Sequence, residues 1–313
     1  MDELTRKKLK KEVSTATRAM AIANRFAPVS GKRIKIKLPG RTLMAVYYPV
    51  GKTNAPMIFA FHGGGYVFGG CALDDSLYVA LQKKLGANII SVGYRKAPKY
   101  KFPSAQMDCY EAVKYFVENP EYDFDRNRVA VYGGSAGANA AIAVSTLAKK
   151  NGGPNLGMRI LTYPFCDAYT SPYEKPGIED DVAPMYEYFN EIGGEPKDAK
   201  NPLVSPLFGT AEELDTTTPT ICVLAECDAL NAEGKQTMDF LKENGCDVET
   251  YEAKGMPHGF FEFGFAPTSE KSASYLPEGI KKLRESGVLI EQKDWSLEKI
   301  KEFWKRHFEA QES

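Results

Sequence analysis

A serine framed by glycines is the first group in this sequence that could do covalent chemistry. Ser135 is the middle residue of Gly133–Gly137, GGSAG, which has the pattern G-x-S-x-G. The apolar run Val129–Tyr132 predicts a buried strand before it, and Ala138–Lys150 predicts a helix after it. On a sharp turn between strand and helix, a serine is presented as a nucleophile, and small neighbours permit the cramped backbone. The alternative is a glycine-rich turn whose serine caps the helix.

A run of three glycines upstream could stabilise the negative charge that such a nucleophile creates. Met57–Phe61 predicts another buried strand, and it ends in the segment His62–Tyr66, HGGGY. Backbone N–H groups in such a loop, together with the N–H of the residue after the nucleophile, Ala136, bind an oxyanion during acyl transfer. A flexible turn and a phosphate-binding loop are the alternatives. No G-K-[ST] follows, and no G-x-G-x-x-G opens a helix here.

A serine hydroxyl needs a general base, and the sequence offers three histidines. His62 belongs to the glycine loop, and His307 lies in a charged C-terminal helix predicted over Glu298–Gln311, where it should be half exposed. His258 follows the strand-like run Val248–Ala253, in a loop punctuated by proline and glycine. Loops of this kind present side chains for chemistry rather than for packing. We therefore expect His258 to be the base.

The carboxylate that orients the base is expected between the nucleophile and the base, in the chain order Ser, Asp or Glu, His. The run Thr220–Ala225 predicts a strand, and Asp228 is the first acidic residue beyond its end. Glu226 would lie on the strand itself, where burial of a charge is costly unless it is paired. We assign Asp228, with Glu226 and Glu233 as alternatives.

Together these motifs resemble the hormone-sensitive-lipase-like family of α/β-hydrolase carboxylesterases. The likeness runs from about Ala45 to Phe263, and several separated motifs in the right order are more specific than any one of them. The matching segments are His62–Gly65, Tyr94–Pro98, Phe102–Pro103 with Asp108, Gly133–Gly137, Asn201–Leu207, Asp228–Leu230 and His258–Phe260.

The resemblance implies an α/β-hydrolase fold with a helical cap and no metal or cofactor. It implies His62 as a structural support of the glycine loop. Two departures leave these residues intact: Gly134 stands where the family usually has an acidic residue, and Lys99 replaces another carboxylate. The implied site residues are the nucleophile Ser135, the base His258, its partner Asp228, and the oxyanion-hole donors Gly64, Gly65 and Ala136.

Strand-like and helical runs alternate along the chain, which predicts an α/β fold with a mostly parallel central sheet covered on both faces. The predicted strands are Leu43–Tyr48, Met57–Phe61, Ile89–Tyr94, Val129–Tyr132, Arg159–Tyr163, Thr220–Ala225 and Val248–Ala253. The predicted helices are Ser76–Leu85, Ser104–Glu118, Ala138–Lys150 and Glu233–Glu243.

We expect residues 1–313 to form a single α/β-hydrolase domain, with cap elements at about 1–30 and 169–214. A C-terminal extension at about 266–313 should end in an amphipathic helix capped near Ser296. The stretch 266–293 could contact the cap, mediate a homodimer, or do neither.

Composition excludes several classes of protein. The 313 residues are 43% hydrophobic and carry 40 basic and 41 acidic side chains, so nothing suggests a nucleic-acid partner. Six cysteines without a C-x-x-C pair are typical of a reducing compartment. The N-terminus lacks an apolar signal segment, and no apolar run approaches the roughly 18 residues of a membrane span. We expect a cytoplasmic protein.

These observations predict a serine carboxylesterase that hydrolyses short-chain acyl esters, such as acetates or butyrates, through an acyl-enzyme intermediate. The partner is then a small-molecule ester. An amide or lactone hydrolase, or a sugar O-deacetylase, would use the same residues. A non-catalytic small-ligand receptor on the same scaffold is a further alternative.

Overall fold

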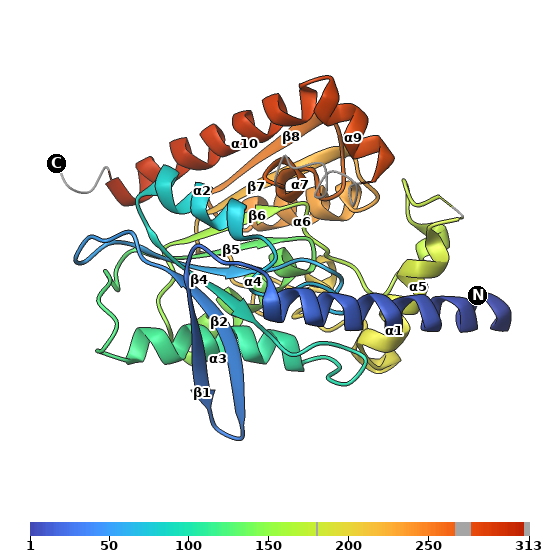
Figure 1. Cartoon of the computed structure of the whole chain (residues 1–313), viewed down its shortest axis with the longest axis horizontal. Coiled ribbons are helices and arrows are strands. Elements are labelled where there is room, and N and C mark those ends of the chain that lie inside the picture. The colour runs from blue at the N-terminus through green and yellow to red at the C-terminus, as the bar shows by residue number, and fades with distance from the viewer. Residues whose placement is uncertain (180, 267–276, 310–313) are drawn as a thin grey trace.

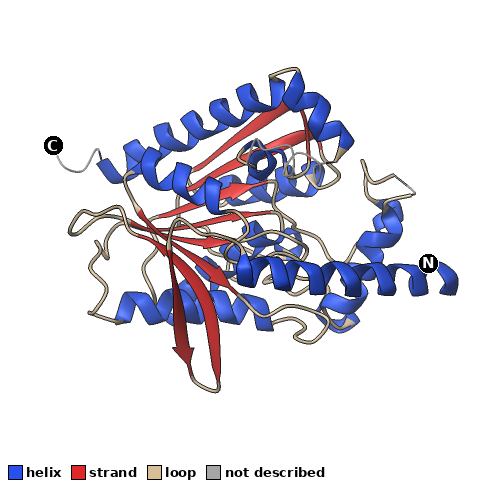
Figure 2. Cartoon of the chain, viewed as in Figure 1, coloured by secondary structure: helices blue, strands red, loops and turns tan. Residues whose placement is uncertain are grey.

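A sheet of eight strands with helices on both faces forms the centre of the molecule in the computed structural model (Figure 1, Figure 2). The structure describes residues 1–179, 181–266 and 277–309. The strand order is β1-β2-β4-β3-β5-β6-β7-β8. The strands are β1 (Lys32–Leu38), β2 (Arg41–Tyr48), β3 (Met57–Phe61), β4 (Asn88–Gly93), β5 (Val129–Gly134), β6 (Met158–Thr162), β7 (Thr220–Cys227) and β8 (Val248–Pro257).

The sheet is mostly parallel, as the alternation of elements predicted. Strands β3 to β8 pair in parallel, whereas β2 is antiparallel to both of its neighbours, β1 and β4. The carboxyl ends of β5, β7 and β8 therefore meet at one edge of the sheet. The three predicted catalytic side chains follow these ends.

Strand β1 was missing from the predicted elements. Its sequence, KRIKIKL, alternates charged and apolar residues, and Ile36 and Leu38 are buried while Lys35 and Lys37 are exposed. That period of two is the pattern of a half-buried strand, so the sequence contained the evidence for it. Lysines on an edge strand also discourage pairing with another chain.

Nine α-helices lie in the part of the chain that the structure describes. The four predicted helices all form, and each begins at most two residues earlier than expected. The helices are α1 (Glu3–Phe26), α2 (Asp75–Leu85), α3 (Ser104–Glu118), α4 (Ala136–Asn151), α5 (Ala183–Gly193), α6 (Asn231–Glu243), α7 (Phe260–Gly264), α9 (Glu278–Glu285) and α10 (Val288–Trp304).

Alternate residues of the central strands pack into two apolar layers, one on each face of the sheet. In β3, Phe59 and Phe61 pack toward α3 and α4, while Ile58 and Ala60 pack toward α2 and α10. Figure 1 shows α3 and α2 on opposite sides of the sheet. Side chains of a strand alternate between its faces, so a strand that is buried on both must be apolar throughout. All five residues of β3 are buried accordingly.

Two helices from distant parts of the sequence lie side by side beyond the carboxyl edge of the sheet. Figure 1 shows α1 running past α5, and salt bridges join them. The N-terminal amino group lies 3.0 Å from Glu187, and Arg6 lies 3.2 Å from Glu191. These helices fall within the predicted cap segments, 1–30 and 169–214. Among the residues described, no helix is both long and apolar enough to cross a membrane.

The predicted start of the C-terminal helix is wrong. Helix α10 begins at Val288, after Gly287 with a φ of 83°, and not near Ser296. Ser296 is buried inside the helix, where its hydroxyl donates to the Gln292 carbonyl at 2.7 Å. The helix is longer because Leu289 also packs against the sheet. Residues 267–276 and 310–313 of the predicted extension lie outside the described residues.

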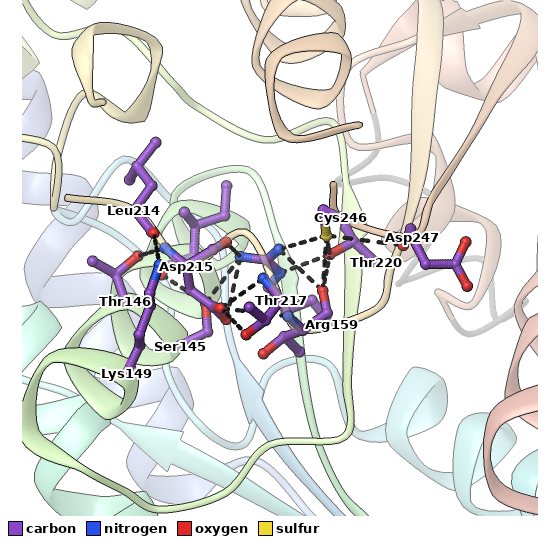
Figure 3. A network of polar contacts seen from close by, with 12 residues as sticks. Ser145, Thr146, Lys149, Arg159, Leu214, Asp215, Thr217, Thr220, Cys246 and Asp247 are labelled. Carbon is purple, nitrogen blue, oxygen red and sulfur yellow. Dashed lines mark hydrogen bonds and ion pairs between the residues drawn. The ribbon is translucent and has the colours of Figure 1, made fainter. Parts of the chain in front are cut away.

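A closed polar network occupies the amino ends of β6 and β7 (Figure 3). Arg159 is fully buried, and its guanidinium donates to the Thr220 hydroxyl at 2.7 Å and the Ser145 hydroxyl at 3.0 Å. It also donates to the carbonyls of Asp215 and Thr218. A buried guanidinium is tolerated only when its donors are satisfied in this way.

Candidate active site

The turn that carries Ser135 is strained and leaves no room for side chains on either side. Ser135 joins β5 to α4 with a φ of 57° and a ψ of −122°, a conformation that L-residues rarely adopt. Its N–H donates to the Thr162 carbonyl at 2.9 Å. A Cβ atom at Gly133 would overlap the carbonyl of Gly137, and one at Gly137 would overlap the carbonyl of Phe61. The glycines of the motif are therefore a steric requirement.

The structure brings the three predicted catalytic residues into one chain of hydrogen bonds. His258 Nε2 lies 3.0 Å from Ser135 Oγ, and His258 Nδ1 lies 2.8 Å from Asp228 Oδ2. The Asp228 side chain has no exposed surface, and its other oxygen accepts the Leu230 N–H at 2.9 Å. These distances are those of a nucleophile, a general base and the carboxylate that orients it.

The two alternative carboxylates are engaged elsewhere. Glu226 is exposed at the end of β7, where it accepts hydrogen bonds from Lys254 at 3.0 Å and from the Gly255 N–H at 2.8 Å. Glu233 is buried, and it lies 2.6 Å from the Lys175 ammonium while accepting the Cys166 N–H at 2.7 Å. Neither is the hydrogen-bond partner of the imidazole.

The glycine loop presents unused backbone donors beside Ser135. Gly64 and Gly65 adopt φ values of 107° and 60°, which favour glycine. Among the described residues, the N–H groups of Gly64, Gly65 and Ala136 donate to no acceptor, and these three residues line the same cavity as Ser135. The Tyr66 hydroxyl anchors the loop by donating to the side chain of Asn139 on α4 at 2.5 Å.

His62 is buried against this loop, away from the catalytic hydrogen bonds. Its ring stacks on Tyr94 at 4.1 Å between centroids, and its Nδ1 lies 2.8 Å from the Gly63 carbonyl. Burial is the main cause that lowers its pKa to about 3, so the ring is neutral. His307 takes no part in these hydrogen bonds either. Its two ring nitrogens lie 2.9 Å from the Phe303 carbonyl and 2.9 Å from the Asp247 carboxylate, and its side chain is half-buried.

A cavity of about 1320 Å³ opens onto Ser135 and His258. Aromatic side chains from the glycine loop and from α5 form part of its wall. Phe68 and Phe189 meet edge to face with their ring centroids 5.4 Å apart. A Cβ atom at Gly65 would come within 2.8 Å of the Phe189 ring. Helix α5 therefore packs directly on the predicted oxyanion loop.

Two carboxyl groups with raised pKa values lie in the cavity wall, and neither was predicted from the sequence. Glu262 lies on α7, and its Oε1 accepts the Tyr132 hydroxyl at 2.9 Å. Asp74, which precedes α2, is a second carboxyl of the wall. Burial raises the pKa of Asp74 to about 6, and burial followed by the charge of Asp74 raises that of Glu262 to about 8. Neither residue belongs to a motif in the sequence; the one indication was that Glu262 follows His258 by about one helical turn.

Known proteins resemble this chain in sequence and in fold. Residues 58–262 match the family described as the α/β hydrolase fold. The chain is 33% identical over 241 residues to an arylesterase of Saccharolobus solfataricus, a match that covers 74% of this chain and 78% of that one. It is 30% identical over 212 residues to an ethyl acetate hydrolase of Pseudomonas putida, with 65% of each chain covered.

The solved structures include an esterase of Pyrobaculum calidifontis with a TM-score of 0.71 and 27% sequence identity. That match covers 95% of this chain and 94% of the other. The chain therefore belongs to the α/β-hydrolase family and, within it, to the hormone-sensitive-lipase-like carboxylesterases.

Proposed function

We propose that this protein is a serine carboxylesterase that acts through an acyl-enzyme intermediate. Its family makes it a carboxylic ester hydrolase. The observation that carries the mechanism is the chain of hydrogen bonds from Ser135 through His258 to Asp228, which ends in a cavity lined by unused N–H groups.

In the proposed first step, Ser135 Oγ attacks the ester carbonyl while His258 Nε2 takes its proton. Asp228 accepts the hydrogen bond from His258 Nδ1–H, which fixes the tautomer that leaves Nε2 free to act as the base. The resulting imidazolium returns the proton to the leaving alcohol. Water activated by the same imidazole then releases the acid from Ser135.

The N–H groups of Gly64, Gly65 and Ala136 are proposed to hold the oxyanion of each tetrahedral intermediate. They are backbone donors with no acceptor in the described part of the chain, so no hydrogen bond seen there has to break before they bind a developing charge. Donors that are already oriented cost no reorganisation at the moment of reaction. This is the reason that one such donor is worth roughly 3–4 kcal/mol of transition-state stabilisation in a hydrolase.

We further propose a preference for short acyl chains. The Phe189 ring packs against the turn at Gly65, and Phe68 meets it edge to face, so two aromatic side chains line the cavity next to the proposed oxyanion loop. The relative from Pseudomonas putida is named for the hydrolysis of ethyl acetate, a small ester, which supports the same preference.

Replacement of the nucleophile tests the mechanism. Ser135→Ala should lower the kcat for p-nitrophenyl acetate by at least about 10⁴-fold. Its melting temperature should remain near that of the wild type. An organophosphate probe should label the wild type at Ser135 and leave the variant unlabelled. A non-catalytic receptor would give neither turnover nor label, and that result would end the proposal.

A panel of p-nitrophenyl esters from acetate to laurate tests the acyl preference separately. We expect kcat/KM to be highest for acetate or butyrate and to fall with longer chains. A maximum at octanoate or beyond would overturn the preference and leave the serine mechanism intact. Amide, lactone and acetylated-sugar substrates in the same panel would reveal any of the alternative activities.

A further inference from the structure

We propose that Glu262 is a positioning residue of the esterase reaction, whose carboxyl group fastens the segment bearing His258 to the two strands that hold Ser135. This inference rests on the proposed serine mechanism. It concerns a carboxyl group that belongs neither to the chain of hydrogen bonds nor to the predicted oxyanion hole.

The contacts of Glu262 reach both strands of the nucleophile turn. Oε1 accepts the hydroxyl of Tyr132, which lies on β5 three positions before Ser135, at 2.9 Å. The same oxygen lies 3.4 Å from the hydroxyl of Thr162 on β6. The backbone carbonyl of Thr162 in turn accepts the Ser135 N–H. One carboxyl oxygen is therefore linked to the strained turn through two neighbouring strands.

The other end of the side chain belongs to the segment of the base. Glu262 lies in the short helix α7, which begins two residues after His258. Its neighbours Phe260 and Phe261 are fully buried and belong to the same apolar layer as α10. These apolar contacts hold α7 against the outer layer. Glu262 adds a hydrogen bond from α7 to β5, the strand that ends at the Ser135 turn.

Space at residue 134 explains why the carboxyl group can take this position. A Cβ atom at Gly134 would overlap Glu262 Oε1 and come within 2.9 Å of Thr162 Oγ1. A side chain at the residue before the nucleophile and the carboxyl of Glu262 therefore exclude each other. In this chain the acidic group beside the turn comes from α7, whereas position 134 is bare.

Two substitutions of Glu262 test the proposal, because one keeps the hydrogen-bond acceptor and the other removes it. Gln keeps an acceptor oxygen at the same place, whereas Ala removes it and leaves the buried Tyr132 hydroxyl without its partner. A misplacement of about 1 Å in a catalytic group costs on the order of 10²-fold. Glu262→Ala should therefore lower kcat on that order while KM changes little, and Glu262→Gln should restore most of the loss.

A double-substitution cycle separates positioning from a general structural role. Tyr132→Phe removes the donor, so it should lower kcat in the wild type but have little effect in the Glu262→Ala background, because the two groups share one bond. Gly134→Ala should likewise cost more kcat when Glu262 is present than when it is absent. Glu226→Gln, at an exposed carboxylate, serves as the control and should leave kcat and KM unchanged.

The proposal is overturned if Glu262→Ala keeps the wild-type kcat, if Glu262→Gln loses as much as Glu262→Ala, or if the effects of Tyr132→Phe and Glu262→Ala simply multiply. If Glu262→Ala does not fold, Glu262→Gln and Tyr132→Phe still decide, since a positioning role requires most of the wild-type kcat from the first and a reduced kcat from the second. Failure of the serine mechanism itself would differ, because Ser135→Ala would then retain turnover.

Discussion

The amino and carboxyl ends of the parallel strands differ in whether hydrogen-bond donors have acceptors among the described residues. At the amino ends of β6 and β7, the guanidinium of Arg159 is buried and donates to hydroxyl and carbonyl groups on all sides (Figure 3). At the carboxyl ends, Ser135 and His258 line a cavity, and neighbouring N–H groups have no acceptor among the described residues. We call the amino end closed, because the donors of Arg159 have acceptors within the protein, and the carboxyl end open toward a ligand.

The pKa values of buried carboxyl groups also differ between the two ends. Burial acts to raise the pKa of Asp215, but the charge of Arg159 and hydrogen bonds from Thr218 and Thr217 outweigh it, so the pKa lies below its ordinary value. At the open end, burial and the charge of Asp74 raise the pKa of Glu262 with no cation to offset them. One end of the sheet therefore keeps a buried charge paired for stability, whereas the other holds the proposed catalytic groups and a carboxyl group with no cationic partner among the described residues.

The largest effect is expected from Asp228→Asn at the open end. An amide in place of the carboxylate favours the wrong tautomer of His258, so kcat should fall on the order of 10⁴-fold while the melting temperature changes little. Kinetics with p-nitrophenyl acetate and a thermal melt measure both. Glu226→Gln is the matched control at the end of the same strand. A large loss in the control, with Asp228→Asn active, would reverse the assignment.

Arg159→Met should do the opposite at the closed end. It leaves the Asp215 carboxylate buried without its cation, which typically costs about 3–5 kcal/mol of unfolding free energy. The kcat of the folded protein should remain that of the wild type. Urea denaturation followed by activity assays in the absence of urea measures the two quantities. Ser145→Ala, which removes a single hydrogen bond, should cost only about 1 kcal/mol.

Loss of kcat in the folded Arg159→Met protein would show that the two ends are coupled. In that case stability and catalysis would not be separated between the two ends. An unchanged unfolding free energy would contradict the structural role of the network.

A smaller catalytic loss is expected from Gly65→Ala. The added methyl would press on the Phe189 ring at 2.8 Å and would also strain a φ of 60°, so the loop should shift and kcat should fall on the order of 10²-fold. Gly40→Ala is the matched control, since Gly40 has a φ of 72° and no atom within 4 Å of the added methyl. It should lose stability alone. Equal kcat values in the two variants would contradict a role for the loop.

The last prediction concerns stability instead of kcat, and it follows from the raised pKa of Glu262. Because the pKa rises from an ordinary 4.5 to about 8 on folding, the folded chain keeps a proton that the unfolded chain releases between these values. The contribution of Glu262 to the free energy of unfolding therefore falls as the pH rises from about 4.5 to about 8. Glu262→Gln cannot titrate, so its melting temperature relative to the wild type should increase from about pH 5 to pH 8.

Thermal melts across this pH range measure the difference. Each kcal/mol corresponds to roughly 2–4 °C for a chain of this size. A difference in melting temperature between the two proteins that stays constant with pH would show that Glu262 does not titrate in this window. Asp74 contributes with the same sign over a lower range, because its pKa rises to about 6, and it is present in both proteins.

The sequence determined the fold class, the order of the motifs and the candidates for chemistry. Short-range patterns suffice for these, because periodicity, glycines and turns are written within a few residues. The missed strand β1 belongs with them, since its alternation of lysine and isoleucine was visible. The start of α10 could not be predicted from a local pattern, because the helix extends to Leu289 through the packing of that residue against the sheet.

Tertiary structure decided which groups act on one another. Asp228 and Glu226 are two residues apart, and only the fold turns one toward His258 and the other toward Lys254. Glu262 meets Tyr132 across 130 positions of the chain. Such contacts depend on how strands are ordered in the sheet and how helices pack on it. No local pattern encodes that order, because the atoms that meet come from segments far apart in the sequence.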